Sequence, residues 1–251
     1  MLADVRPVPR WGPTGHPVSV VVFDGDDTLW LTEHLYDAAR EAARAVVERA
    51  GASGELWERL QRTIDVQNVE LLGHSPRRFP TSCVEAFREA VPGARFDPEG
   101  DVADAVWEAA EAVFTATAPL RPDALGVLTT LAGYGIRLAL LTKGDPDVQA
   151  RRILESGLAP AFEALKIVPE KTRDSFRSLI EEMKAHPSEA VSVGNSVHSD
   201  VLPALDAGLE AIWLPAHVWE FERQRDDLVP ERVQLARELT DVLSLLGLPA
   251  V

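Results

Sequence analysis

The chain has 251 residues, with 25 basic and 40 acidic side chains and a formal net charge of −15. This charge disfavours binding to nucleic acid and to anionic membrane surfaces, so we expect a small-molecule partner. The single cysteine, Cys83, excludes an internal disulfide and a multi-cysteine metal site. No apolar run reaches the roughly 18 residues of a spanning helix. We therefore expect a cytoplasmic protein, and the sequence leaves its oligomeric state open.

The first regular element is an apolar run that ends in acidic residues. Residues 18–23 (VSVVVF) follow an irregular lead-in over residues 1–17, and they are too few for a helix. Their uniformly apolar character predicts a strand buried on both faces of a parallel sheet. Asp24, Asp26 and Asp27 follow directly. Asp is a common turn residue, but like charges this close repel, which favours a site with a cation or a reaction.

The next part of the chain is helical. Apolar residues recur at helical spacing, which predicts helices over residues 33–50, 55–72, 83–91 and 101–117. No convincing strand lies between them. An all-helical block after the first strand indicates an inserted domain over residues 31–118.

Strands and helices alternate again after residue 119. We predict strands over residues 136–141, 165–168, 191–193 and 211–214. We predict helices over residues 122–133, 148–156, 201–207 and 231–246, and a further helix that begins at an N-cap, Thr172. In the first of these we expect Leu125, Leu128 and Leu131 to point inward. These elements form a core domain of residues 1–30 and 119–251.

Four motifs lie at the ends of predicted strands or in the loops beside them. Residues 23–29 (FDGDDTL) resemble the first motif, DxDx[TV], of the haloacid dehalogenase (HAD) superfamily in its phosphatase form. An apolar strand closed by Thr142 resembles the second motif, and Lys171, before an amphipathic helix, resembles the third. Residues 194–200 (GNSVHSD) resemble the fourth, with Asn195 in place of the usual first Asp.

The resemblance implies both a fold class and an activity. The fold is α/β: a Rossmann-like doubly wound parallel sheet, the HAD core, with an inserted all-helical cap domain. The activity is Mg²⁺-dependent hydrolysis of a small phosphate monoester through an aspartyl-phosphate. Asp24 is then the nucleophile, and Asp26 is the general acid and base.

The remaining motif residues then hold the phosphoryl group or the metal ion. The implied phosphate-binding residues are Thr142, Lys143 and Lys171. The implied magnesium ligands are Asp24, Asp26 through its backbone carbonyl, Asn195 and Asp200. Because an amide oxygen lacks the charge of a carboxylate, we expect Asn195 to lower the affinity for metal.

Other interpretations fit parts of the pattern. A phosphotransferase or mutase uses the same two aspartates with another acceptor, whereas a dehalogenase lacks an acid at the position of Asp26. A non-catalytic HAD-fold binding protein is suggested by Asn195 alone. The substrate is not determined, and the candidate specificity residues are Trp30, Glu33, His34, Tyr36, His74, Arg77 and Arg78. Arg77 and Arg78 are candidates for a second anionic group of the substrate.

Overall fold

The computed structural model describes residues 9–11, 15–91, 100–216 and 229–249, so most of the predicted lead-in over residues 1–17 lies outside the described residues. The chain divides into two compact units. We call Met1–Leu31 with Pro119–Val251 the α/β unit and Thr32–Ala118 the helical unit. In the part of the chain that the structure describes, no helix has the length and apolar character needed to cross a membrane.

The α/β unit is built on one parallel six-stranded sheet with the order β3-β2-β1-β4-β5-β6. The strands are β1 (Val20–Phe23), β2 (Arg137–Lys143), β3 (Ala164–Val168), β4 (Ala190–Gly194), β5 (Glu210–Trp213) and β6 (Gln234–Leu235). β1 lies between β2 and β4 and is fully buried, as its apolar sequence predicts. The predicted doubly wound α/β fold is confirmed. Ligands of such sheets bind beyond the carboxyl ends of the strands, where the strand order reverses.

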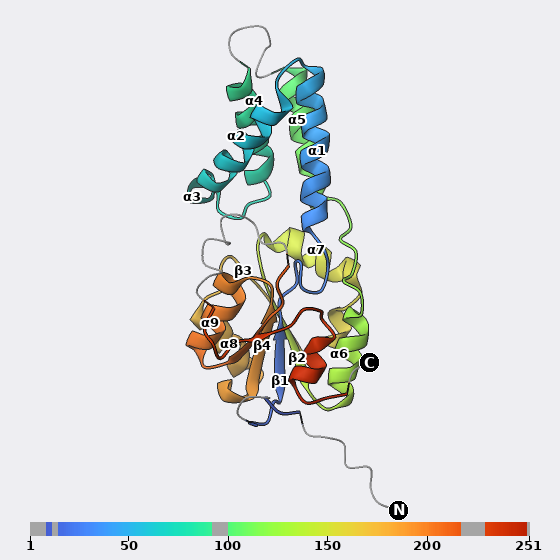
Figure 1. Ribbon diagram of the computed structural model, residues 1–251, viewed down its shortest axis with the longest axis vertical. Coiled ribbons are helices and arrows are strands. Elements are labelled where there is room, and N and C mark those ends of the chain that lie inside the picture. Colours follow the sequence, from blue (N-terminus) through green and yellow to red (C-terminus); the bar gives the residue numbers. More distant parts are fainter. Residues whose placement is uncertain (1–8, 12–14, 92–99, 217–228, 250–251) are drawn as a thin grey trace, which may run out of the picture. The chain divides into compact units, whose positions relative to one another are not determined.

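Helices cover both faces of this sheet (Figure 1). They are α6 (Ala124–Gly133), α7 (Pro146–Ser156), α8 (Arg173–Glu182), α9 (Leu202–Ala207) and α11 (Asp241–Leu245). Val20 and Val22 of β1 share a buried cluster with residues of α8 and α9. Because successive strand residues point to opposite faces, Val21 and Phe23 face the other side of the sheet, the side on which α6 lies (Figure 1).

Two predictions for the α/β unit are wrong. Leu125 is 58% exposed, because the buried face of α6 is formed instead by Ala124, Val127, Leu128 and Leu131. The helix predicted over residues 231–246 is a short strand, β6, followed by a turn and the five-residue α11. Pairing of β6 with β5 and two backbone N–H bonds to Asp241 Oδ2 replace helical hydrogen bonds there.

The helical unit contains α1 (Glu33–Arg49), α2 (Gly54–Gln67), α3 (Val69–Leu72), α4 (Arg78–Ala90) and α5 (Asp101–Glu111). The helix predicted over residues 55–72 is interrupted at Asn68. The one predicted from residue 83 begins at Arg78, because Pro80 lies in its first turn, where the missing N–H removes no helical bond. The fourth ends at Glu111 and continues only as a tight turn, Ala112–Phe114.

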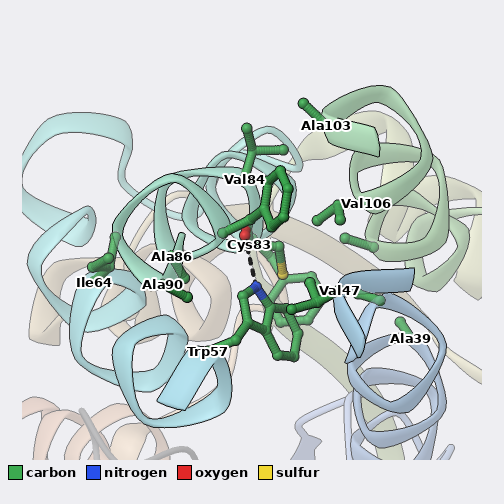
Figure 2. Packing of buried hydrophobic residues seen from close by; sticks show 14 of the residues in the cluster. Ala39, Val47, Trp57, Ile64, Cys83, Val84, Ala86, Ala90, Ala103 and Val106 are labelled. Atoms are coloured by element: carbon green, nitrogen blue, oxygen red, sulfur yellow. Dashed lines mark hydrogen bonds between the residues drawn. The ribbon is translucent and has the colours of Figure 1, made fainter. Parts of the chain in front are cut away.

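The core of the helical unit is apolar and closely packed. Figure 2 shows Trp57 of α2 beside Cys83 of α4, with Val47 of α1 and Val106 of α5 in the same cluster. The indole N–H of Trp57 donates to the carbonyl oxygen of Cys83 at 2.9 Å, so this buried polar atom has a partner (Figure 2). Burial raises the pKa of the Cys83 thiol well above its usual value.

Arg78 lies inside the helical unit and is not a surface residue. Its guanidinium donates to the carboxylate of Asp65 at 2.5 Å, and the two side chains are 9% and 6% exposed. The hypothesis that Arg78 meets an anionic group of the substrate is therefore wrong, because the start of α4 turns this side chain into the core. Arg77, the preceding residue, is exposed.

Candidate active site

Three charged side chains meet at the carboxyl ends of β1 and β4. Asp24 directly follows β1, Asp200 lies in the turn after β4, and Lys171 precedes α8. The ammonium group of Lys171 donates to Oδ1 of Asp24 and to Oδ1 of Asp200, each at 2.5 Å. The three residues are only 7%, 2% and 7% exposed. Two carboxylates and one ammonium give this buried group, which we call the Asp–Lys–Asp group, an excess of negative charge.

The backbone after β4 fixes the position of Asp200. A Cβ at Gly194 would lie 2.3 Å from Cγ of Asp200, so the carboxylate occupies space that only glycine leaves. The backbone N–H of Ser196 donates to Oδ2 of Asp200 at 2.9 Å. The hydroxyl of Ser192 donates to the Asp200 carbonyl oxygen at 3.0 Å. Oδ1 is thereby left facing Lys171.

The other two members of the group are held in a similar way. The Thr172 hydroxyl accepts from the N–H of Ser175, and the Ser175 hydroxyl accepts from the N–H of Thr172, so a capping box begins α8 directly after Lys171. The predicted N-cap at Thr172 is confirmed. Asp24 accepts a bond from the Thr28 hydroxyl on Oδ2, at 2.9 Å.

The electrostatics of the Asp–Lys–Asp group are dominated by burial. Burial raises the pKa of Asp24 to about 7; the carboxylate of Asp200 adds to this shift, and Lys171 opposes it. Burial alone would lower the pKa of Lys171, but the carboxylates of Asp200 and Asp24 outweigh it, and the pKa is raised. Lys171 therefore stays charged. Any further positive charge placed beside Asp24 would stabilise the ionised form of its carboxylate.

Asp26 lies next to this group and is held by three donors. The indole N–H of Trp30 donates to Oδ1 at 2.6 Å. Gln149 Nε2 and Arg152 Nη1, both from α7, donate to Oδ2 at 2.9 and 2.6 Å. The side chain of Asp26 is still 29% exposed. Trp30 is buried against Gly25, so its predicted place among the specificity residues is wrong.

Sequence reasoning missed Gln149 and Arg152. Both are buried polar residues, spaced three apart on α7, whose first turn follows Thr142 by only a few residues. A glutamine and an arginine on the inward face of a helix beside a motif strand are the signal that could have found them, because buried polar groups need partners.

Thr142 and Lys143 end β2 at the same edge of the sheet. The Thr142 hydroxyl donates to Gln149 Oε1 at 3.2 Å, so it is linked through that amide to Asp26. The ammonium of Lys143 donates to the Ser199 hydroxyl at 3.0 Å, in the turn that carries Asp200. The candidate phosphate-binding residues thus lie beside the candidate catalytic ones.

The donor set around Asp24 and Asp200 fits a magnesium ion. Among the described residues, no three His, Cys, Asp or Glu side chains gather as a metal site. Magnesium does not need such a set, since one or two carboxylates with waters and substrate phosphate are its usual ligands. Asp24 and Asp200 are two carboxylates that already converge on one cation, Lys171. The backbone of Asn195 is fixed by a bond from the Trp213 indole to its carbonyl oxygen, at 2.9 Å.

Known proteins resemble this chain in sequence and in fold. A family model described as haloacid dehalogenase-like hydrolase matches residues 18–208. Phosphoserine phosphatase of Thermus thermophilus is 32% identical over 228 residues, which cover 78% of this chain and 88% of that protein. Glyceraldehyde 3-phosphate phosphatase of Methanopyrus kandleri is 29% identical over 236 residues, or 90% and 97% of the two chains. The crystal structure of a haloacid dehalogenase-like family hydrolase from Xanthomonas campestris superposes with a TM-score of 0.75 at 23% identity, covering 96% of this chain and 97% of that one, which shows a shared fold.

Proposed function

The chain belongs to the haloacid dehalogenase-like hydrolase family and is a phosphoric monoester hydrolase within it, and we propose that it cleaves a small phosphate monoester through a phosphorylated Asp24. The predicted membership of this family is confirmed. The observation that carries the proposal is the buried Asp–Lys–Asp group at the carboxyl edge of the sheet. Phosphoryl transfer requires mainly positioning and neutralisation of charge, and this group supplies a fixed carboxylate beside a fixed cation.

In the first step a carboxylate oxygen of Asp24 forms a bond to phosphorus. The bond from phosphorus to the leaving oxygen breaks, and its electron pair stays on that oxygen. Lys171 and Thr28 hold Oδ1 and Oδ2 of Asp24, so the carboxylate is oriented before the substrate arrives. A covalent intermediate divides one difficult displacement into two easier ones.

Asp26 handles the protons in both steps. It protonates the leaving alcohol oxygen in the first step and takes a proton from the attacking water in the second. In that second step the water oxygen bonds to phosphorus, and the electron pair of the broken bond returns to Asp24. The greater exposure of the Asp26 side chain, 29% against 8% for Asp24, suits exchange with alcohol and water.

The rest of the site binds phosphate and magnesium. We propose that Thr142, Lys143 and Lys171 bind the phosphoryl oxygens. The magnesium ligands of the proposal are Asp24, the backbone carbonyl of Asp26, Asn195 and Asp200. When bound, Mg²⁺ supplies positive charge that offsets the carboxylates and the phosphate dianion. Phosphatases of this family generally use this ion, and the two converging carboxylates of this chain support the same choice.

We propose that the substrate is a small phosphorylated metabolite and that the helical unit is the cap domain that selects it. The names of the two phosphatase relatives point to substrates of this size, phosphoserine and glyceraldehyde 3-phosphate. The strongly negative chain also disfavours polyanions such as nucleic acid.

The test is a phosphate-release assay with a panel of small monoesters, including these two, in Mg²⁺ and in EDTA. We expect release with Mg²⁺, loss of release in EDTA, and, after acid quenching, one phosphoryl group on the peptide that contains Asp24. Release that persists in EDTA would remove magnesium from the proposal. A phosphorylated alcohol in place of free phosphate would assign a phosphotransferase, and no turnover of any monoester would overturn the proposal.

A further inference from the structure

We propose that Gln149 and Arg152 are positioning residues that orient the Asp26 carboxylate and confine its proton exchange to one oxygen, Oδ1. The inference rests on the proposed function, in which Asp26 is the general acid and base. Gln149 and Arg152 contact this carboxylate from α7 and are nearly inaccessible to solvent.

Arg152 is the buried charge in this network. It is 4% exposed, and a guanidinium removed from water costs stability unless a carboxylate compensates it. Its Nη1 lies 2.6 Å from Oδ2 of Asp26. A planar guanidinium that donates at this distance fixes the rotation of a carboxylate more firmly than a flexible ammonium can. Arg152 is thus placed to hold Asp26 in one orientation.

The two oxygens of Asp26 differ in the room they leave for a proton. An ionised carboxylate offers about four lone-pair positions, two on each oxygen. Oδ2 already accepts from both Gln149 and Arg152, which fills its two positions. Among the described residues, Oδ1 accepts from Trp30 and from no second donor. One lone pair of Oδ1 therefore remains, and we assign the transferred proton to it.

The start of α7 explains why these two side chains reach Asp26. Oδ1 of Asp145 accepts from the backbone N–H groups of Asp147 and Val148, at 3.0 and 3.1 Å, and so caps the helix. Gln149 and Arg152 are three residues apart and share a face of that helix. From this face both side chains point to Oδ2 of Asp26.

Gln149 also ties Asp26 to the end of β2. Its Oε1 accepts from the Thr142 hydroxyl, and its Nε2 donates to the Lys143 carbonyl oxygen at 3.1 Å. A Cβ at Gly144 would lie 3.1 Å from that same Nε2, and the φ of Gly144 is +139°, so glycine permits the close approach. One amide group thus joins the acid to the candidate phosphate-binding strand end.

The experiment compares leaving groups. In Arg152→Gln and Gln149→Met, we expect kcat for an alkyl phosphate to fall about 10- to 100-fold, because general acid catalysis contributes about 10²- to 10⁴-fold and part of it remains. For p-nitrophenyl phosphate, whose leaving group needs little protonation, the fall should stay within about threefold. KM should hold for both substrates in Arg152→Gln, since Arg152 is assigned no substrate contact. For Gln149→Met the readout is the difference in kcat between the two leaving groups, because this change also removes the acceptor of the Thr142 hydroxyl.

The matched control is Arg151→Gln. It removes the same charge from the same helix, but Arg151 pairs with Glu155 at 3.6 Å. Among the described residues, the donors to the Asp26 carboxylate are Trp30, Gln149 and Arg152, and Arg151 is not one of them. Arg151 is partly buried, with its side chain 33% exposed. We expect its replacement to leave both rates unchanged within about twofold, because it alters no bond to the Asp26 carboxylate.

A double-mutant cycle with Asp26→Asn separates this inference from the proposed function. Once the acid is absent, Arg152→Gln should cause no further loss on the alkyl phosphate. If Asp26→Asn alone lowers kcat equally for both substrates, the proposed role of Asp26 fails. If Asp26→Asn shows the leaving-group effect but Arg152→Gln and Gln149→Met do not, the positioning role alone is overturned. If Arg152→Gln does not fold, the neutral change Gln149→Met decides between the same outcomes.

Discussion

The α/β unit and the helical unit both bury charged side chains, but they differ in the number of carboxylates that contact the buried cation. In the helical unit Arg78 faces one carboxylate, Asp65, at 2.5 Å. In the α/β unit Lys171 faces two carboxylates, Asp24 and Asp200, each at the same distance. The first pair is carried by two packed helices, α4 and α2, and the second group by segments beside the sheet's carboxyl edge.

The difference teaches that burial of charge does not by itself mark a functional site. Burial raises the pKa of Asp65 and of Asp24 alike, and a basic partner opposes the shift in each case. Beside Asp24 the carboxylates of Asp200 and Asp26 raise the pKa further, whereas beside Asp65 the charges of Arg78 and Arg40 both lower it. A balanced pair completes a core, whereas an unbalanced group is stabilised by an additional cation.

The largest expected effect comes from removing the nucleophile of the unbalanced group. Asp24→Asn keeps the shape of the side chain but cannot form the aspartyl-phosphate, so we expect turnover to fall by about 10⁴-fold or more. Circular dichroism should show an unchanged fold. Phosphate release within about tenfold of the parent would reject Asp24 as the nucleophile.

Breaking the balanced pair should instead cost stability. Asp65→Ala leaves the Arg78 guanidinium buried without this partner, and we expect the free energy of unfolding to fall by about 3–5 kcal/mol in urea denaturation. The double variant Asp65→Leu with Arg78→Met should recover part of the loss, because apolar residues of similar volume can replace a buried pair. Equal stability of the single and double variants would contradict a charge-balancing role.

The pKa of Asp24 predicts competition between protons and magnesium. At limiting Mg²⁺, we expect the acidic limb of the kcat/KM profile near pH 7, where Asp24 ionises. Saturating Mg²⁺ favours the carboxylate and should move that limb down by about one pH unit or more. An acidic limb that stays at the same pH at every Mg²⁺ concentration would show that Asp24 is not a magnesium ligand.

The raised pKa of Asp24 lowers activity at acidic pH, but it lowers the stability of the metal-free protein as the pH rises. Because folding raises the pKa of Asp24 from 3.8 to about 7, its stabilising contribution is complete below pH 3.8 and is lost as the pH rises to about 7. Asp24→Asn should remove this pH dependence, which thermal melts in EDTA at several pH values can measure.

The smallest expected effect concerns Asn195, where the chain departs from the family motif. Asn195→Asp adds a carboxylate, and we expect the Mg²⁺ concentration for half-maximal activity to fall about 3- to 10-fold, since hard cations gain affinity with ligand charge. Gln67→Glu makes the same amide-to-carboxylate change at an exposed position of the helical unit and should leave the titration unmoved. An unmoved titration in Asn195→Asp would place Asn195 away from the cation.

The sequence by itself determined the features that depend on short stretches of chain. A uniformly apolar run must be buried on both faces, which made β1 a central strand, and Thr172 could be identified as a cap from its neighbours. Asp24, Lys171 and Asp200 could be grouped because motifs at the ends of parallel strands lie at one edge of a sheet. Most predicted helices are helices in the structure, but the ends of several differ, as at Asn68 and Arg78, and the one predicted over residues 231–246 is mostly β6 and a turn.

Tertiary structure alone decided which long side chains meet. Arg77 and Arg78 are adjacent and identical in type, yet only the packing of α4 turns Arg78 onto Asp65 and into the core. Arg152 reaches Asp26 across 126 residues of chain, and no local pattern encodes that pair. The physical reason is the distance along the chain over which each signal acts. Periodicity and capping depend on residues a few positions apart, whereas the partner of a buried charge depends on which elements pack around it.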